Sequence, residues 1–251
     1  MTPAFDEMVE ALKGLHILHI GFENADNALK RDIGVETCVA GCGKCCMENT
    51  PYSRVIEAIN AISVLTGQGK LRKAVSVAEG WLLENHKEAR IYEGRPPVVV
   101  SPLIHQEWLN LRQTQCPFLQ DSLQCMIHDV RPLTCRAFGV TYEVHDTCPR
   151  RPGKGETQSQ FKYAKSDLLK SSVIGYWDQC REWKSEWVVS GFLPTLIYRA
   201  AEPEKFKKMI LDNKIASAKI IGVNYDISLM WQPQIESLRQ GKLPDLVAAL
   251  R

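Results

Sequence analysis

The sequence predicts a mainly α-helical fold, with residues 1–251 forming a single compact domain. Apolar residues recur at helical spacing in most of the chain before residue 90 and again after residue 158. Residues 36–150 hold eight of the cysteines, and residues 114–157 show few periodic runs. We therefore expect N- and C-terminal helices to enclose an irregular cysteine-rich core at 36–150, with a helical C-terminal element at 158–251.

The composition is that of an ordinary globular protein. The chain has 251 residues, of which 45% are hydrophobic and 24% charged. A chain of this length buries roughly 70–75% of its unfolded surface, so it does not need metals or disulfides merely to fold. The formal net charge is only +2, from 31 Lys and Arg against 29 Asp and Glu. This balance gives no general attraction to nucleic acids or anionic membranes, and we expect neither as a partner.

The first twenty residues do not resemble an export signal. They carry Asp6, Glu7 and Glu10 where a signal peptide would be basic, and His16 and His19 interrupt the apolar run. No stretch approaches the roughly 20 apolar residues that would span a bilayer. We therefore expect a cytoplasmic protein, whose nine cysteines are thiols or metal ligands rather than disulfides.

Three helices are predicted before residue 90. The first covers 2–30, and its apolar positions share one face. The second begins at Ser53 as N-cap, with Glu57 beyond it, and ends at Thr66 before a turn at Gly67 to Gly69. The third covers 71–86, so the last two form a helical hairpin. The residues expected to face the core are Phe5, Met8, Val9, Leu12, Leu15, His19, Val55, Ile56, Ile59, Ile62, Leu65, Val75, Ala78, Trp81 and Leu82.

Fewer elements are predicted in the rest of the chain. A short helix is expected at 103–113, and residues 150–158 have the composition of an exposed linker. Two further helices are expected at 166–187 and 202–220, and they should pack back on the N-terminal part.

Four cysteines fall within nine residues near the N-terminus: Cys38, Cys42, Cys45 and Cys46. Gly41 and Gly43 flank Cys42, so the backbone there can adopt positive φ angles and bring the sulfurs together. Thiolates this close repel one another unless a cation lies among them. The pattern therefore predicts a metal-binding core rather than buried apolar thiols.

A second group of four cysteines follows much later: Cys116, Cys125, Cys135 and Cys148. Cys116 and Cys148 directly precede proline, as some iron–sulfur ligands do. Pro132 suits the first turn of a short helix, which would place Cys135 near its N-terminus. Arg131 and Arg136 flank this cysteine, and we expect them to offset the negative charge of a thiolate-bound centre.

Together these motifs resemble the zinc- or iron-chelating CxxCxxCC domain of the YkgJ-like cysteine-cluster proteins. The resemblance covers about Cys38 to Cys148 and includes the CPFL and RPLTCR motifs. It implies eight metal-binding residues: Cys38, Cys42, Cys45, Cys46, Cys116, Cys125, Cys135 and Cys148. Three residues rather than two separate Cys38 from Cys42. Flagellin lysine methylases carry a similar cysteine pattern, so the resemblance implies a site more directly than a reaction.

Spacing alone leaves the cofactor open among two zinc ions, one four-iron cluster with spare cysteines, and two clusters. The resemblance and the Cys-Pro pairs favour an iron–sulfur cluster of the 4Fe–4S type. Such a protein would be redox-active or would modify a protein or peptide, with a redox protein or a peptide substrate as partner. The alternative is structural zinc that shapes a partner-binding surface.

The remaining candidates favour structural roles. Cys180 lies on a helical pattern with three tryptophans and is interpreted as a core thiol. His128 and His145 are interpreted as hydrogen-bonding or surface residues rather than ligands. The sequence contains no GxGxxG, Walker A, HExxH or nucleophile-elbow motif, so nucleotide and hydrolase chemistry lack support.

Overall fold

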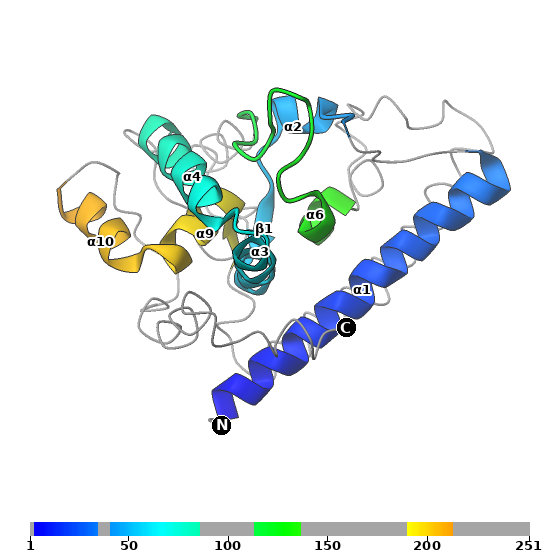
Figure 1. The fold of residues 1–251 in the computed structure, drawn as a ribbon, viewed down its shortest axis with the longest axis horizontal. Coiled ribbons are helices and arrows are strands. Elements are labelled where there is room, and N and C mark those ends of the chain that lie inside the picture. The colour runs from blue at the N-terminus through cyan, green and yellow to red at the C-terminus, as the bar shows by residue number, and fades with distance from the viewer. Residues whose placement is uncertain (1–2, 35–40, 86–112, 137–189, 213–251) are drawn as a thin grey trace, which may run out of the picture.

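The computed structural model describes residues 3–34, 41–85, 113–136 and 190–212 (Figure 1). Within them helices dominate, as predicted. The elements in chain order are α1 (Pro3–Ile33), α2 (Lys44–Glu48), β1 (Tyr52–Arg54), α3 (Val55–Gly67), α4 (Leu71–Asn85), the 3₁₀ turn η1 (His128–Val130), α6 (Leu133–Arg136), β2 (Ser190–Phe192), α9 (Leu193–Ala201) and α10 (Pro203–Leu211).

The hairpin of α3 and α4 forms as predicted. All five apolar residues expected to face the core from α3 are buried, and so are Ala78, Trp81 and Leu82 of α4. The chain reverses at Gly69, which has a φ of 67°. That left-handed conformation favours glycine because it carries no Cβ.

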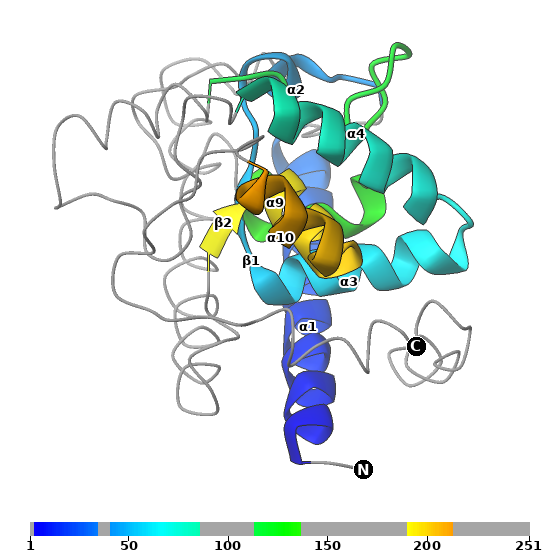
Figure 2. The ribbon, with the colours of Figure 1, turned by 90° about the vertical axis from the view of Figure 1, so that its left-hand side faces the viewer.

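Helix α9 fills the space between the two arms of this hairpin (Figure 2). Tyr198, at its centre, has no exposed surface, and Phe192 at its N-cap is 1% exposed. Phe192 also belongs to β2, which pairs antiparallel with β1 through the partners Tyr52 and Phe192. Within the described part of the C-terminal element, β2 and α9 therefore pack back on the N-terminal part, as expected from the sequence.

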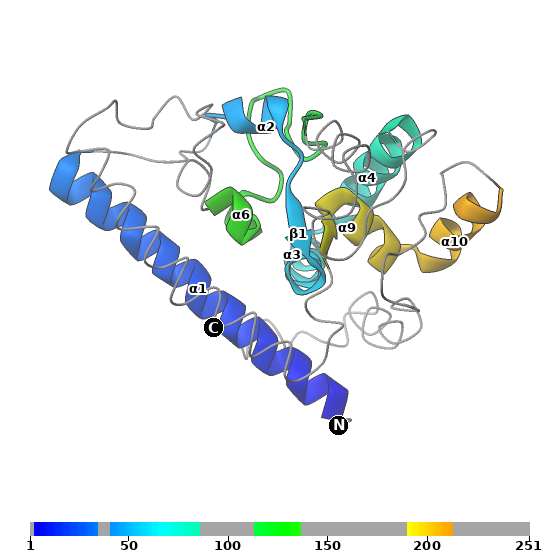
Figure 3. The same ribbon diagram turned by 180° about the vertical axis from the view of Figure 1, so that it is seen from behind.

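Helix α1 runs along the opposite side of the molecule, and α6 lies between it and β1 (Figures 1 and 3). The buried face of α1 includes five large apolar residues and one histidine. These are Met8, Leu12, Leu15, Leu18, Phe22 and His19. This face of α1 packs against α3 and α6.

Several predicted boundaries need correction. Ser53 is not a helix N-cap but lies in β1, and α3 begins at Val55. Helices α2 and α9 and the strand pair are not predicted from the sequence, because such short elements contain too few residues to show periodicity. Helix α10 falls within the predicted 202–220. The predicted helices at 166–187 and over nearly all of 103–113, and the linker at 150–158, lie outside the described residues.

Candidate metal centre

Six of the eight predicted ligands lie in the described part of the chain: Cys42, Cys45, Cys46, Cys116, Cys125 and Cys135. Cys116 is buried, and the other five are partly buried. Cys38, Cys148, Cys180 and His145 lie outside the described residues. Five of the six described cysteines come from two separate segments of the chain, 42–46 and 116–125.

Helix α2 carries Cys45 and Cys46 and begins after Gly43, whose φ is 57°. A Cβ atom at Gly43 would lie 3.0 Å from the carbonyl oxygen of Leu123 and 3.1 Å from Cδ1 of Leu119. Both neighbours belong to the second cysteine segment. Glycine at this position therefore provides both the left-handed turn and the close approach between the two segments.

The second segment folds back on itself between Cys116 and Met126. The N–H of Met126 donates to the carbonyl of Phe118 at 2.8 Å, and Leu119 and Cys125 form an isolated antiparallel bridge. Phe118 is completely buried and anchors the loop in the core. This turn brings Cys116 and Cys125 toward the same place.

Direct contacts connect the two segments. The backbone N–H of Cys116 donates a 2.8 Å hydrogen bond to the carbonyl of Cys46. The Sγ atoms of Cys45 and Cys46 lie 4.0 Å apart. Cys42 and Cys46 act electrostatically on Cys45, and Cys125 and Cys45 act on Cys116. These contacts and influences place the five cysteines near one another, and we call them the five-cysteine cluster.

Without a cation, two thiols of the five-cysteine cluster resist ionisation. The hydrogen bond with Cys46, followed by burial and the neighbouring cysteines, raises the pKa of Cys45 well above its usual range. Burial, followed by the charge of Cys125, raises the pKa of Cys116 in the same way. A bound metal cation reverses this preference because it replaces the protons and stabilises thiolates.

A chain of hydrogen bonds from a tryptophan to two threonines supports both cysteine segments. The indole N–H of Trp81 in α4 donates to Oγ1 of Thr114 at 3.0 Å, and Oγ1 of Thr114 lies 2.9 Å from Oγ1 of Thr50. The Thr50 hydroxyl in turn lies within hydrogen-bond distance of the carbonyls of Thr114 and Gln115. Thr50 and Thr114 are close in sequence to Cys46 and Cys116. The chain from Trp81 through Thr114 to Thr50, the threonine–tryptophan chain, therefore fixes the two segments against α4.

Glu57 fixes the start of α6, the short helix that carries Cys135, the sixth described cysteine. Its carboxylate accepts hydrogen bonds from the backbone N–H of Leu133 at 2.6 Å and from the N–H of Arg54 and the hydroxyl of Ser53, both at 2.8 Å. Burial raises the pKa of Glu57, and these hydrogen bonds oppose the shift. The sequence indicates Glu57 only as a residue near a helix start, but in the structure it joins β1, α3 and the segment that carries Cys135.

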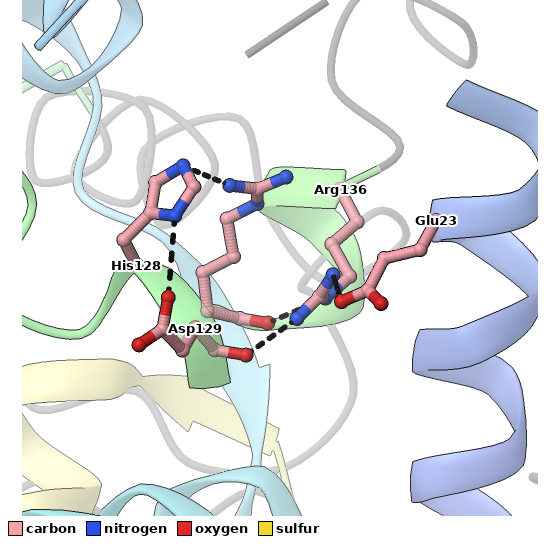
Figure 4. A network of polar contacts seen from close by, with 5 residues as sticks. Glu23, His128, Asp129 and Arg136 are labelled. Atoms are coloured by element: carbon pink, nitrogen blue, oxygen red, sulfur yellow. Dashed lines mark hydrogen bonds and ion pairs between the residues drawn. The ribbon is translucent and has the colours of Figure 1, made fainter. Parts of the chain in front are cut away.

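Pro132 directly precedes α6, so the predicted helix start at this proline is confirmed. Arg136 points toward α1, where its Nη1 lies 3.3 Å from Oε1 of Glu23 (Figure 4). Arg131 contacts Nε2 of His128 through Nη1. His128 is thus a hydrogen-bonding residue, as expected. Among the charges that act on Cys45 and Cys116, neither arginine appears, so the sequence prediction that they serve the metal centre gains no support at these two thiols.

The donor set suits a thiophilic metal, because the five-cysteine cluster offers sulfur donors that are buried or partly buried. Within the described ranges, no group of three or more Cys, His, Asp or Glu side chains already has the spacing of a metal site. Cysteines of the five-cysteine cluster would hold a metal after loss of their protons.

The comparison with protein families decides the class of this site. The model of the CxxCxxCC family, described as "Putative zinc- or iron-chelating domain", matches residues 37–158. Residues 37–158 are therefore similar to the CxxCxxCC family. All eight predicted ligands fall inside this range, and Cys180 falls outside it. The match assigns chelation of zinc or iron to the cysteine-rich part of the chain, as the sequence motifs indicate.

Neither the curated proteins nor the solved structures gave a match to this chain. The helices in the described ranges include none that is both long and apolar enough to cross a membrane.

Proposed function

We propose that this chain is an iron–sulfur protein that holds a 4Fe–4S cluster among its cysteines. The proposal is supported above all by the five-cysteine cluster, because a 4Fe–4S cluster takes four thiolate ligands and these neighbouring cysteines are enough to supply them. Cys116, which directly precedes Pro117, also has the dipeptide found beside some cluster ligands.

In this proposal the ligands come from the five-cysteine cluster, with Cys38, Cys135 and Cys148 as the remaining candidates from the family motif. A bound cluster would supply one-electron redox chemistry. The chain's own residues give up thiol protons, exclude water and fix the ligands. Phe118 and Cys116 are buried, so water has little access from that side. The threonine–tryptophan chain fixes the backbone close to Cys46 and Cys116.

The proposed role is redox chemistry, or modification of a protein or peptide, in the reducing cytoplasm. Two exposed apolar residues beside the five-cysteine cluster support a protein or peptide partner. Met47 in α2 is 44% exposed, and Leu123 in the second segment is 38% exposed. Apolar side chains next to a metal centre are suited to contact with a partner close to the site of reaction.

A structural zinc site is the second candidate, and the spacing of Cys45 and Cys46 favours it. Two thiolates bound to one tetrahedral zinc at 2.3 Å lie about 3.8 Å apart. The observed 4.0 Å between their Sγ atoms is close to that value. In this case zinc would fix the two segments together and shape the surface formed by Met47 and Leu123 for a partner.

Metal and sulfide analysis after purification without oxygen distinguishes the two candidates. The iron–sulfur protein should be brown and contain iron and acid-labile sulfide in similar amounts, with little zinc. Stoichiometric zinc without sulfide would reject the cluster and establish the second candidate. Chelator treatment followed by reconstitution, first with iron and sulfide and then with zinc alone, checks that the metal found is not a product of expression conditions.

A further inference from the structure

Leu123 combines an unfavourable backbone conformation with a partly exposed apolar side chain. Its φ is 59°, and no other non-glycine residue in the described ranges has a positive φ. Leucine rarely adopts this left-handed conformation, because its Cβ crowds the following carbonyl oxygen. The residue is 38% exposed. Strained backbone of this kind is found mainly at functional sites, which points to a role for this side chain beyond stability.

The turn that contains Leu123 does not itself require a leucine. The N–H of Leu123 donates to the carbonyl of Gln120 at 2.8 Å, and the N–H of Gln120 donates to the carbonyl of Gln124 at 2.9 Å. These bonds close a short loop at the end of the antiparallel bridge between Leu119 and Cys125. All of them are backbone bonds, and glycine or asparagine is favoured at the left-handed position of such a loop. Either residue would make the same turn with less strain.

The leucine side chain lies against the turn that leads into α2. A Cβ atom at Gly43 would lie 3.1 Å from Cβ of Leu123 and 3.1 Å from Cδ1 of Leu119. Gly43 follows Cys42 and directly precedes α2, which carries Cys45. The two leucines therefore cover the short stretch of backbone between two cysteines of the five-cysteine cluster.

Leu123 also lies close to the cysteines of its own segment. Cys125 follows it by two residues and acts electrostatically on Cys116, as does Cys45 from the other segment. Cys42 in turn acts on Cys45. Leu123 is thus placed where the two cysteine segments meet, with one side on Gly43 and the rest toward solvent.

We propose that Leu123 shields the five-cysteine cluster, and the metal bound to it, from small reagents in solution. A competing ligand must reach a thiolate-bound metal to displace it, and an apolar side chain over the Gly43 turn slows that approach, because the hydrophobic surroundings of a metal site control access from solvent. The part that concerns the metal rests on the proposed metal function, and it applies to zinc as well as to an iron–sulfur cluster.

Chelator competition with the full chain, purified without oxygen, tests this role. A chromophoric chelator is added in excess to the metal-loaded protein, and metal release is followed by absorbance. Leu123→Asn should release metal several-fold faster than the wild type, because it removes the apolar cover and keeps the turn. Leu123→Met keeps an apolar side chain of similar volume and should release metal at the wild-type rate. Equal rates for wild type and Leu123→Asn would overturn the proposal.

Denaturant unfolding of the same proteins separates shielding from a general loss of stability. Asparagine tolerates the left-handed conformation better than leucine, so the unfolding midpoint of Leu123→Asn should equal or exceed that of the wild type. A lower midpoint, or failure of this variant to fold, would overturn the proposal, because the leucine would then serve folding.

Leu211→Asn is the matched control, since Leu211 is an exposed leucine on α10. It should release metal at the wild-type rate, and release as fast as that of Leu123→Asn would overturn the proposal. If the purified wild type holds no metal, the proposed metal function fails and the shield is tested on the thiols alone. Iodoacetamide should then alkylate the five-cysteine cluster faster in Leu123→Asn, as measured by mass spectrometry, and equal alkylation rates would reject the shield too.

Discussion

The backbone N–H of Cys116 donates a 2.8 Å hydrogen bond to the carbonyl oxygen of Cys46. This bond joins the ends of two segments that are far apart in sequence, and each segment supplies cysteines to the same cluster. The sulfurs of Cys45 and Cys46 are adjacent to it, and Cys125 reaches the same place through the turn that follows Cys116. Backbone contacts therefore bring the two halves of the family motif together.

Serine substitutions should identify the ligands. Replacing Cys45, Cys116 or Cys135 by Ser should remove most of the bound metal, because a hydroxyl is a poor ligand for thiophilic ions. The readout is metal per chain after anaerobic purification. Cys180→Ser is the matched control and should retain full metal content, since it lies outside the family match. Wild-type metal content in all three variants would show that the site lies elsewhere.

Removing a hydrogen-bond donor from the threonine–tryptophan chain should lower metal affinity, although none of its residues is a metal ligand. Thr50→Val and Trp81→Phe each remove one donor from it, and we expect metal affinity to fall about tenfold, as for other partners of ligand-bearing segments. Thr50→Ser keeps the hydroxyl and should restore affinity. Competition with a chromophoric chelator measures these affinities.

Tyr198→Phe is the control for these variants because Tyr198 donates to Glu79, on the same helix α4 as Trp81. It should cost about 1 kcal/mol of stability, the usual contribution of one hydrogen bond, and leave metal affinity unchanged. If Tyr198→Phe lowers metal affinity as much as Thr50→Val does, the effect belongs to general stability and not to positioning.

Gly43→Ala should destabilise the protein more than Gly34→Ala. Both glycines have left-handed φ angles, 57° and 67°, and alanine there costs about 1–2 kcal/mol. A Cβ at Gly43 would also meet Leu123 at 3.0 Å, whereas a Cβ at Gly34 meets nothing within 4 Å. Denaturant unfolding measures both variants. Equal losses would mean that the two cysteine segments do not approach each other as described.

Stability should fall as the pH drops below about 6.5, in part because of His19. Its pKa is lowered from 6.5 to about 3 in the folded state, so between these values the unfolded chain binds a proton that the folded chain does not. Protonation therefore favours unfolding as pH falls, by about 1.4 kcal/mol per pH unit for one such group. His19→Leu should flatten this part of the profile, and the exposed His16→Gln should not. Parallel wild-type and His19→Leu profiles from pH 4 to 7 would contradict the assignment.

The sequence by itself determined the helices with long amphipathic patterns and the class of the site. Burial of Met8, Leu12, Ile59 and Leu82 follows from their spacing, because a helix repeats every 3.6 residues whatever surrounds it. The crowding of Cys42, Cys45 and Cys46 likewise indicated metal binding, since thiolates so close in sequence cannot separate far in space.

Only the tertiary structure decided how distant residues meet. The bond between Glu57 and Leu133 and that between Trp81 and Thr114 both cross long stretches of chain, and no local pattern encodes such pairs. The same holds for Arg136, which the sequence places beside Cys135 but the fold directs toward Glu23 of α1. Neighbours in sequence share a backbone, but the direction of each side chain depends on which helix packs against it.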